Sequence, residues 1–264
     1  MSGLDTSSTP RAQCPRVNIL GVGLSAINRQ QAVQVIFDAL KENRRGYVTV
    51  TGTHGVIEAQ DDSQVRSILN NAYLCVPDGM PMVWIGKLRR YRGMGRVYGP
   101  DLMLDVCEAS VSRGLRHFFY GGANGCAEEL KLKLTARFPA LQVVGVFEPP
   151  FRPLNPEEAD ALLLQVETAR PDILWVGIST PKQERFMAEY LPKLPVSLML
   201  GVGAAFDFHA GRQKPTPRWA QHSGIEWLYR LCHSPRRLWR RNVNNFRLIP
   251  LFLAQWIGLK KYRL

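Results

Sequence analysis

The sequence predicts an α/β fold: a mostly parallel sheet with helices on both faces, followed by a basic, helical C-terminal appendage. Three observations lead to this expectation. Short apolar runs alternate with amphipathic segments along most of the 264 residues. The runs are continuously apolar, as parallel strands buried on both faces are. After about Gly211 the strand-like runs stop and the charge becomes strongly positive.

The apolar runs place the expected strands along the chain. We expect strands at residues 17–23, 47–52, 74–77, 116–122, 141–147, 173–179 and 196–203. The segments between them have helical periodicity. Residues 55–72, for example, place Val65, Ile68, Leu69 and Ala72 on one helical face. In open sheets of this kind ligands bind where strands end and helices begin, so these corners are the first places to look for a site.

The C-terminal segment differs from the rest in charge and pattern. Residues 1–211 contain 22 Lys and Arg residues against 21 Asp and Glu residues, whereas residues 212–264 contain 12 against 1. Aromatic residues are interleaved with the arginines, and Pro235 and Pro250 divide the segment into two or three short helices. We therefore expect a flexible N-terminal tail (1–16), a sheet-containing domain (17–211) and an appendage (212–264) with an anionic partner.

Several classes of protein are excluded by composition. The longest apolar stretch, residues 248–259, is too short to cross a bilayer, and the first 16 residues have no apolar core of the kind found in secretory signals. The five cysteines form no Cys-x-x-Cys pair. We therefore expect reduced thiols, a cytoplasmic location and no zinc site.

Asp78 stands at a Pro-Asp-Gly corner directly after the run at 74–77. Turn chemistry alone explains the position, because Asp tolerates tight corners and Gly79 supplies a positive φ. A catalytic base would use the same position at the end of a strand. Both interpretations stay open on these residues alone.

The stretch ISTPKQERF follows another strand-like run. Thr180, Pro181 and Gln183 are suited to be an N-cap, a first-turn proline and a capping-box residue. A helix that begins there would direct its free N–H groups towards a phosphate, with Lys182 as an added positive charge, and Gln183 could instead bind a ligand. A well-capped helix with no ligand is the alternative.

Further candidates lie at the neighbouring corners. Thr51, Thr53 and His54 could orient a sugar, although a threonine N-cap explains the threonines as well. Arg96, just before a helix start at Gly99, could clamp a diphosphate or be a surface charge. The Asp-x-Asp pair with which many sugar-nucleotide enzymes hold a divalent cation is missing from the sequence, so we expect no metal.

A glycine-rich stretch, GVGLSA at residues 21–26, fits the G-x-G-x-x-A form of a dinucleotide fingerprint. The fit is weak because Asp38, the nearest candidate for the ribose-binding acid, lies inside a helical stretch instead of capping a second strand. A glycine-rich bend explains these residues equally well.

Taken in order, a series of short motifs resembles the WecG/TagA/CpsF family of glycosyltransferases. The motifs are V-T-x-T-x-x-x-x-V-x-x-A, PDGMPMVW, R-V-x-G-x-D-L-M, YGG, G-x-F-x-P-P-F-R-P-L, G-x-x-x-PKQE, GVGAAFDFxAG and EWLYRL with PRRLWRR. The resemblance covers the chain from about residue 17 to residue 241. Eight motifs in one order are far more specific than any one of them.

The resemblance implies a Rossmann-like catalytic domain with a C-terminal appendage at the membrane face. It implies transfer of a sugar, such as N-acetylmannosamine, its uronate or another hexose, from a UDP-sugar to a polyprenyl-diphosphate-linked sugar in cell-surface polysaccharide synthesis. The transfer would invert the anomeric centre and need no metal or other cofactor. The enzyme would be a cytoplasmic protein bound peripherally to the inner face of the cell membrane, in contact with its anionic surface.

The resemblance also assigns roles to residues. Asp78 matches the family's catalytic base and Thr51 its active-site threonine. Arg96 and Gln183 match residues near the nucleotide or sugar, and the family's appendage arginines, thought to grip the acceptor diphosphate, match Arg230, Arg237 and Arg240. Thr53, followed by His54, stands where many family members carry asparagine, so the choice of donor sugar stays open.

Two other functions are compatible with parts of the sequence. A nucleic-acid-binding protein would also use a basic, aromatic-rich tail, although the nearly neutral domain before it argues against nucleic acid as the partner. A nicotinamide-dependent oxidoreductase would use the glycine-rich stretch. The sequence does not fix the oligomeric state and is compatible with a homo-oligomer.

Overall fold

The protein is described here from a computed structural model that covers residues 12, 14–233 and 235–264. The side chains of seven residues in the C-terminal helices also lie outside the description: His222, Arg230, His233, Arg237, Leu238, Arg240 and Arg241. Most of the expected N-terminal tail is therefore not described. Its last residue, Arg16, already belongs to the first strand, and its guanidinium donates to the backbone carbonyl groups of Asn70 and Ala72.

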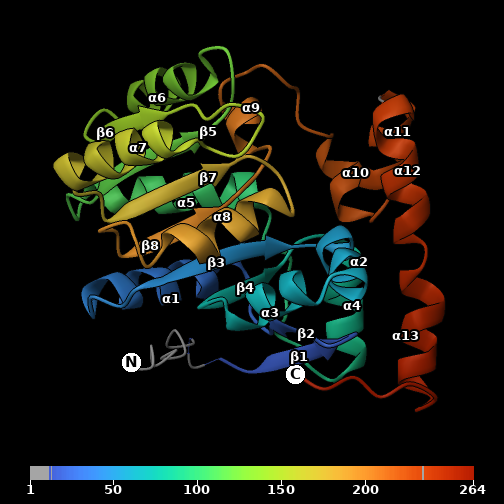
Figure 1. Ribbon diagram of the computed structural model, residues 1–264. Coiled ribbons are helices and arrows are strands. Elements are labelled where there is room, and N and C mark those ends of the chain that lie inside the picture. The colour runs from blue at the N-terminus through green and yellow to red at the C-terminus, as the bar shows by residue number, and fades with distance from the viewer. Residues whose placement is uncertain (1–11, 13, 234) are drawn as a thin grey trace.

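A six-stranded parallel sheet forms the centre of the molecule (Figure 1). The strand order is β4-β3-β8-β7-β5-β6. The strands are β3 (Gly46–Thr51), β4 (Leu74–Pro77), β5 (Arg116–Gly121), β6 (Gln142–Phe147), β7 (Ile173–Gly177) and β8 (Leu198–Gly201). All five neighbouring pairs are parallel. The predicted α/β architecture with a parallel sheet is confirmed.

Helices cover both faces of the sheet. Successive residues of each strand point to opposite faces, so each apolar strand presents side chains to both helix layers. Ile173 and Trp175 of β7 pack on one face, and Leu174 and Val176 on the other. The first face is covered by α1 (Arg29–Lys41), α5 (Gly99–Val111), α6 (Cys126–Arg137) and α9 (Ala205–His209). The second is covered by α2 (Thr53–Asp61), α3 (Ser63–Asn71), α4 (Met80–Leu88), α7 (Pro156–Ala169) and α8 (Lys182–Tyr190).

The expected first strand, residues 17–23, is not part of this sheet. It is split into β1 (Arg16–Ile19) and β2 (Val22–Ser25), which pair antiparallel as a hairpin. Leu20 and Gly21 both have positive φ and form the reversal between the two strands. The glycine-rich stretch therefore lies in a hairpin instead of a strand-to-helix turn, and Asp38 is exposed on α1. The dinucleotide fingerprint lacks the structural context that it needs.

The expected helix at 55–72 is also divided. Asp62 ends α2 and caps α3, because its side chain accepts hydrogen bonds from the backbone N–H groups of Gln64 and Val65. The predicted apolar face is nevertheless formed, since Val65, Ile68 and Leu69 are buried on α3.

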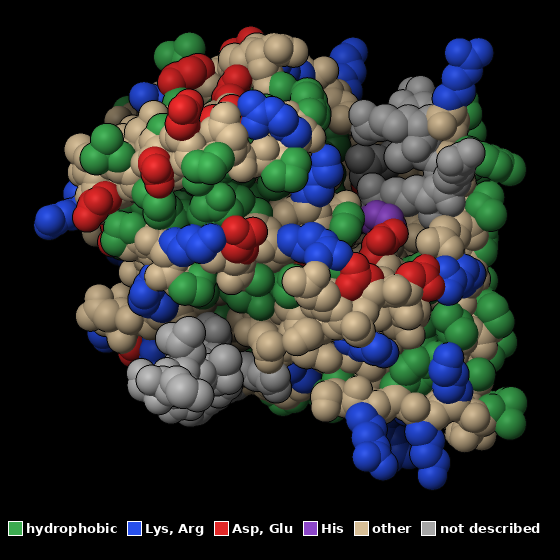
Figure 2. Space-filling view, in the orientation of Figure 1, with side chains coloured by type: hydrophobic (Ala, Val, Ile, Leu, Met, Phe, Trp, Pro, Cys, Tyr) green, Lys and Arg blue, Asp and Glu red, His purple; other side chains and the backbone are tan. Residues whose placement is uncertain are grey.

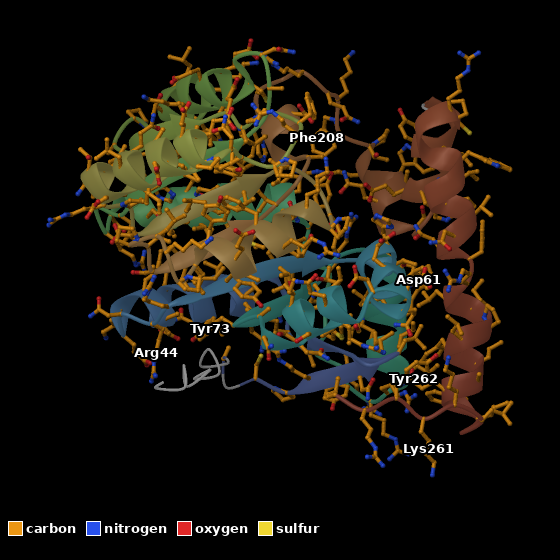
Figure 3. All side chains as sticks on the ribbon, in the orientation of Figure 1. Arg44, Asp61, Tyr73, Phe208, Lys261 and Tyr262 are labelled. Carbon is orange, nitrogen blue, oxygen red and sulfur yellow. The ribbon has the colours of Figure 1, made fainter. Side chains whose placement is uncertain are left out.

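The described part of the C-terminal segment contains four helices, where two or three were expected: α10 (Arg218–His222), α11 (Glu226–His233), α12 (Pro235–Asn245) and α13 (Leu248–Trp256). Pro235 begins α12 as predicted, whereas Pro250 lies inside α13. The last residues return to the β1–β2 hairpin (Figures 1 and 3), where the Asn18 side chain donates to the Tyr262 carbonyl oxygen at 2.8 Å. Among the described residues, no helix is both long and apolar enough to cross a membrane.

Candidate active site

The carboxyl ends of all six parallel strands open into one large cavity of about 1420 Å³. Residues just after each strand line it, in the ranges 51–55, 78–81, 122–124, 149–154, 177–180 and 201–205. Its other wall is formed by side chains of the C-terminal helices. Pockets for a single small-molecule ligand usually measure about 300–1,000 Å³, so this cavity is large enough for an extended ligand or for two ligands side by side.

Asp78 lies at the corner between β4 and α4 and lines the cavity. Its backbone N–H donates to the Thr51 carbonyl oxygen at 2.9 Å, which continues the pairing of β4 with β3 for one more residue. Gly79 has a φ of 85° and begins the turn into α4. The carboxylate is 32% exposed, and Arg96 Nε donates to its Oδ1 at 3.3 Å. A partly exposed carboxylate that lines an open cavity is suited to accept a proton from a ligand.

Arg96 is a basic residue in direct contact with this carboxylate. Its side chain is 14% exposed, and its guanidinium lies 4.4 Å from the centre of the Tyr98 ring. A second carboxylate, that of Glu226, lies 2.6 Å from Arg96 Nη2. Burial acts to lower the pKa of Arg96, but the charges of Asp78 and Glu226 outweigh it and raise the pKa. Arg96 is therefore a permanent cation at the site.

The corner after β3 brings two more predicted residues to the cavity. Thr51 is 2% exposed; its hydroxyl donates to Thr49 Oγ1 at 3.2 Å and accepts from the Cys75 thiol at 3.4 Å. His54 lines the cavity from α2, with Nδ1 3.6 Å from Glu58 Oε1. Thr53 is the first residue of α2, and Gly52 is the N-cap, so the threonine N-cap considered from the sequence is not formed.

The start of α8 differs from the predicted capping box. Pro181 is the N-cap and makes no side-chain cap. The Thr180 hydroxyl instead donates to Glu184 Oε1 at 2.9 Å, and Gln183 Nε2 donates to the same oxygen at 3.1 Å. Lys182 is exposed at the rim of the cavity, and its ammonium donates to the Phe151 carbonyl oxygen at 3.4 Å.

Glu184 is a site residue that sequence reasoning missed. It lines the cavity although its side chain is almost completely buried, and this burial raises the pKa of its carboxyl group. Glu184 Oε2 and Gln183 Oε1 are buried and have no hydrogen-bond partner among the described residues. Buried polar atoms are normally paired, so these two oxygens are suited to meet polar groups of a bound ligand.

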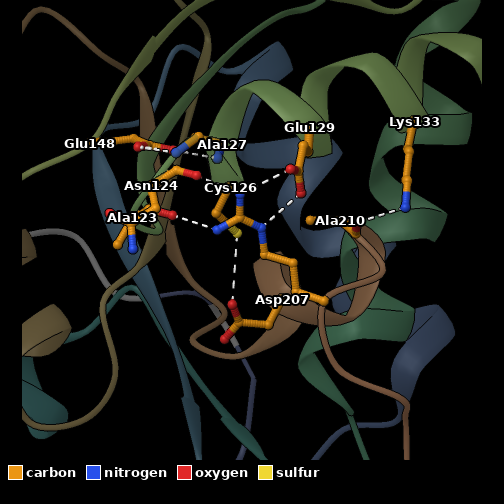
Figure 4. Close-up of polar contacts among 11 residues, drawn as sticks. Ala123, Asn124, Cys126, Ala127, Glu129, Lys133, Glu148, Asp207 and Ala210 are labelled. Atoms are coloured by element: carbon orange, nitrogen blue, oxygen red, sulfur yellow. Dashed lines mark hydrogen bonds and ion pairs between the residues drawn. The ribbon is translucent and has the colours of Figure 1, made fainter.

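The corner after β5 is held by a charged network (Figure 4). Glu148 accepts hydrogen bonds from the backbone N–H groups of Gly125 at 2.8 Å and Ala127 at 2.7 Å. Arg212 donates to the carbonyl oxygens of Ala123 and Asn124, both at 2.6 Å, and pairs with a glutamate of α6. Because a protein carboxylate already occupies the start of α6, this helix terminus is not available to a phosphate in this arrangement.

A model of the Glycosyl transferase WecG/TagA/CpsF family matches residues 17–262. The chain belongs to this family. It is 27% identical over 205 residues to an N-acetylglucosaminyldiphosphoundecaprenol N-acetyl-beta-D-mannosaminyltransferase of Bacillus spizizenii, covering 78% of this chain and 77% of that protein. It is 26% identical over 183 residues to a protein of the same name from Bacillus subtilis strain 168, covering 69% of each.

Membership makes the chain a glycosyltransferase and decides between the functions considered from the sequence. The residues that the resemblance assigned to the centre of the site, namely Asp78, Thr51, Arg96 and Gln183, line a single cavity of this glycosyltransferase. Within the described parts of the chain, no cluster of His, Cys, Asp and Glu side chains has the arrangement of a metal site.

Three assigned arginines of the glycosyltransferase lie outside the described side chains. Arg230 belongs to α11, and Arg237 and Arg240 belong to α12. Both helices border the cavity through described neighbours, among them Trp227 and Asn242. The assigned role of these arginines therefore stays a prediction.

Proposed function

We propose that this glycosyltransferase transfers an N-acetylmannosaminyl group from a UDP-sugar to an N-acetylglucosamine unit linked through diphosphate to undecaprenol. Both relatives carry a name that describes transfer of this sugar to this acceptor, and the aligned region covers 77% and 69% of their lengths. The product would serve the synthesis of a cell-surface polysaccharide. The transfer inverts the anomeric centre and uses no metal.

The observation that carries this proposal is the place of Asp78 in the cavity. Its carboxylate takes the proton of the attacking acceptor hydroxyl while the new glycosidic bond forms and the bond to UDP breaks on the opposite side of the sugar. A well-placed general base contributes typically 10²- to 10⁴-fold to a rate. Thr51 lies beside the Asp78 corner, and Thr53 and His54 at the same end of β3 are suited to contact the donor sugar.

The leaving diphosphate gains negative charge as the bond to the sugar breaks. Preorganised cations and N–H groups stabilise such charge most effectively where water is excluded. Arg96 is partly buried at the cavity wall and Lys182 lies at its rim, so both are suited to this task. Gln183 and Glu184 provide the adjacent polar atoms that a donor substituent would bind. Arg230, Arg237 and Arg240 would hold the diphosphate of the acceptor.

The acceptor's lipid chain stays in the membrane, so the enzyme must reach the bilayer surface. We propose that residues 17–211 form the catalytic domain and residues 212–264 the membrane-docking appendage, at the inner face of the cell membrane. Large apolar side chains are exposed on the described part of this appendage, including Trp219, Trp239, Ile249, Leu253 and Ile257. Apolar and basic side chains on one helical surface are typical of interfacial helices.

Replacement of the base tests this function. In Asp78→Asn, kcat for N-acetylmannosaminyl transfer from the UDP-sugar to the lipid-linked acceptor should fall at least a hundredfold, because the amide cannot accept the proton. Stabilisation against thermal unfolding by the UDP-sugar should be retained. Near-normal turnover in this variant would leave Asp78 as a turn residue only. A requirement for added divalent cation, lost with EDTA, would contradict the metal-independent mechanism.

A further inference from the structure

The appendage contains one acidic residue, and its position is unexpected. From Arg212 to Leu264 the only Asp or Glu is Glu226, against twelve Lys and Arg residues. A segment that binds anionic partners has little use for a negative charge on its outer surface. Glu226 begins α11, its side chain is 15% exposed, and its carboxylate contacts Arg96 of the sheet-containing domain at 2.6 Å.

Arg96 joins this acid to the proposed base. Its Nε contacts Asp78 at 3.3 Å, and its Nη2 contacts Glu226 at 2.6 Å. Its Nη1 donates to the Gln221 carbonyl oxygen at 3.5 Å. Each nitrogen of the guanidinium therefore has a different partner, one on the catalytic corner and two in the segment from α10 to α11.

A second contact links the same two parts of the molecule. Gly224, with a φ of 77°, packs against the ring of Trp84 and the Cβ of Met80, and the Cβ of any other residue there would run into that ring. Met80 is the first residue of α4, two positions after Asp78. Residues 221–226, which we call the elbow, thus contact both the start of α4 and the guanidinium that holds Asp78.

We propose that the elbow is a positioning element for the proposed base, and that Glu226, acting through Arg96, fixes the orientation of the Asp78 carboxylate when the appendage is docked. This inference rests on the proposed function. Arginine loses considerable rotamer freedom when it is held, and removing one partner of a buried ion pair leaves its charge poorly compensated. An error of about 1 Å in the position of a catalytic group can cost a hundredfold in rate. Loss of the Glu226 contact should therefore reduce turnover.

The test uses the full-length enzyme with UDP-N-acetylmannosamine and vesicles that contain undecaprenyl-diphosphate-linked N-acetylglucosamine. In Glu226→Gln we expect kcat to fall about tenfold, with KM for the UDP-sugar changed less than about twofold, because Glu226 acts on the base and not on donor binding. Glu226→Asp keeps the charge but is one methylene shorter, so it should recover part of the lost kcat. Glu157→Gln is the matched control, because Glu157 is also a first-turn acid of a helix, is exposed and lies away from the cavity.

If Glu226 only stabilised the N-terminus of α11, the two Glu226 variants would differ in activity in another way. Aspartate stabilises a helix N-terminus as well as glutamate does, so full activity in Glu226→Asp together with a loss in Glu226→Gln would overturn the proposal. Unchanged kcat in Glu226→Gln would overturn it directly. Amide hydrogen exchange provides a readout that does not depend on activity: exchange in residues 78–88 should be faster in Glu226→Gln, and unchanged exchange there would also overturn the proposal. A wild-type enzyme that transfers no sugar from any UDP-sugar would contradict the proposed function instead.

Discussion

The sheet-containing body and the C-terminal helices differ in where they keep their large apolar side chains. In the body, Trp175, Phe118, Phe119 and Phe206 are almost completely buried. In the described part of the appendage, tryptophan side chains are 39–63% exposed, at positions 219, 227, 239 and 256. Basic side chains lie beside apolar ones along the edge of the molecule formed by α13 (Figure 2). Folding explains these four buried side chains of the body, whereas the exposed tryptophans of the appendage form apolar surface that a partner could cover.

The two parts are nevertheless joined through one face of α13. Leu248 and Phe252 are buried against the same core that contains the β1–β2 hairpin and α2. Arg247 at the start of this helix forms an ion pair at 2.6 Å with Asp61 at the end of α2, and both side chains are about half exposed. Asp61 is labelled in Figure 3. Exposed ion pairs contribute little to stability, so the apolar contacts are the main attachment.

The largest expected effect comes from breaking this attachment. Phe252→Ala should lower the free energy of unfolding by about 3 kcal/mol, because it removes a buried ring and leaves a cavity. Its neighbour Leu253 is 54% exposed, and Leu253→Ala should change the free energy by less than about 0.5 kcal/mol. Urea denaturation of both variants measures the difference. Equal, small losses would mean that α13 does not share the core of the body.

The sequence predicted the body better than the hairpin for a physical reason. Six apolar runs became parallel strands, and five of them are mostly buried on both faces, which leaves a continuous apolar pattern; β6 at the edge of the sheet is only partly buried. The run at 17–23 has the same pattern but is buried between the sheet edge and α13. The positive φ angles at Leu20 and Gly21 reverse the chain and turn this run into a hairpin instead of a single strand. The sequence does not reveal such an angle at a leucine.

The site was predictable where it depends on strand ends and not where it depends on contacts distant in sequence. Asp78 and Thr51 directly follow or end strands, so the topology of a parallel sheet brings them together. Glu226 and its partner Arg96 are 130 residues apart, and nothing in the local pattern of either residue indicates the other. Glu184 was visible within the PKQE motif, but its burial depends on how Thr180 and Gln183 turn towards it.

The next largest effect concerns pH and belongs to the body. His117 is fully buried, accepts a hydrogen bond from Trp175 Nε1 at 2.9 Å, and has a pKa lowered to about 4 by burial. In the unfolded chain its pKa is about 6.5. As the pH falls below about 6.5 the unfolded state takes up a proton that the folded state excludes, so stability is lost until the folded state also protonates near pH 4. The loss from this residue between pH 7.5 and 5 should be about 2 kcal/mol.

Comparison with His117→Asn isolates this contribution. The asparagine oxygen can still accept from Trp175 but does not titrate, so the variant should be less stable at pH 7.5 and should lose about 2 kcal/mol less than the wild type on going to pH 5. Urea denaturation at both pH values measures the loss. Other groups, such as His209, titrate in both proteins, and their contributions cancel in the comparison. Identical pH dependence in the two proteins would show that His117 is not the source.

The smallest expected effect concerns the exposed apolar side chains of the appendage, for which we proposed a membrane surface as the partner. Trp239 is 60% exposed on α12, and Leu132 is 67% exposed on α6 of the body. If the appendage meets the bilayer, Trp239→Ser should weaken binding to vesicles of anionic phospholipid about tenfold, which corresponds to about 1.4 kcal/mol of lost apolar burial. Leu132→Ser should leave vesicle binding unchanged, and neither variant should alter thermal stability measurably.

Co-sedimentation with the vesicles measures the affinity. The ionic strength is kept fixed, because the basic residues also contribute to binding and salt weakens their attraction to the anionic lipids. Equal affinity of the wild type and Trp239→Ser would assign binding to charge alone, and weakening by Leu132→Ser would remove the distinction between the two surfaces.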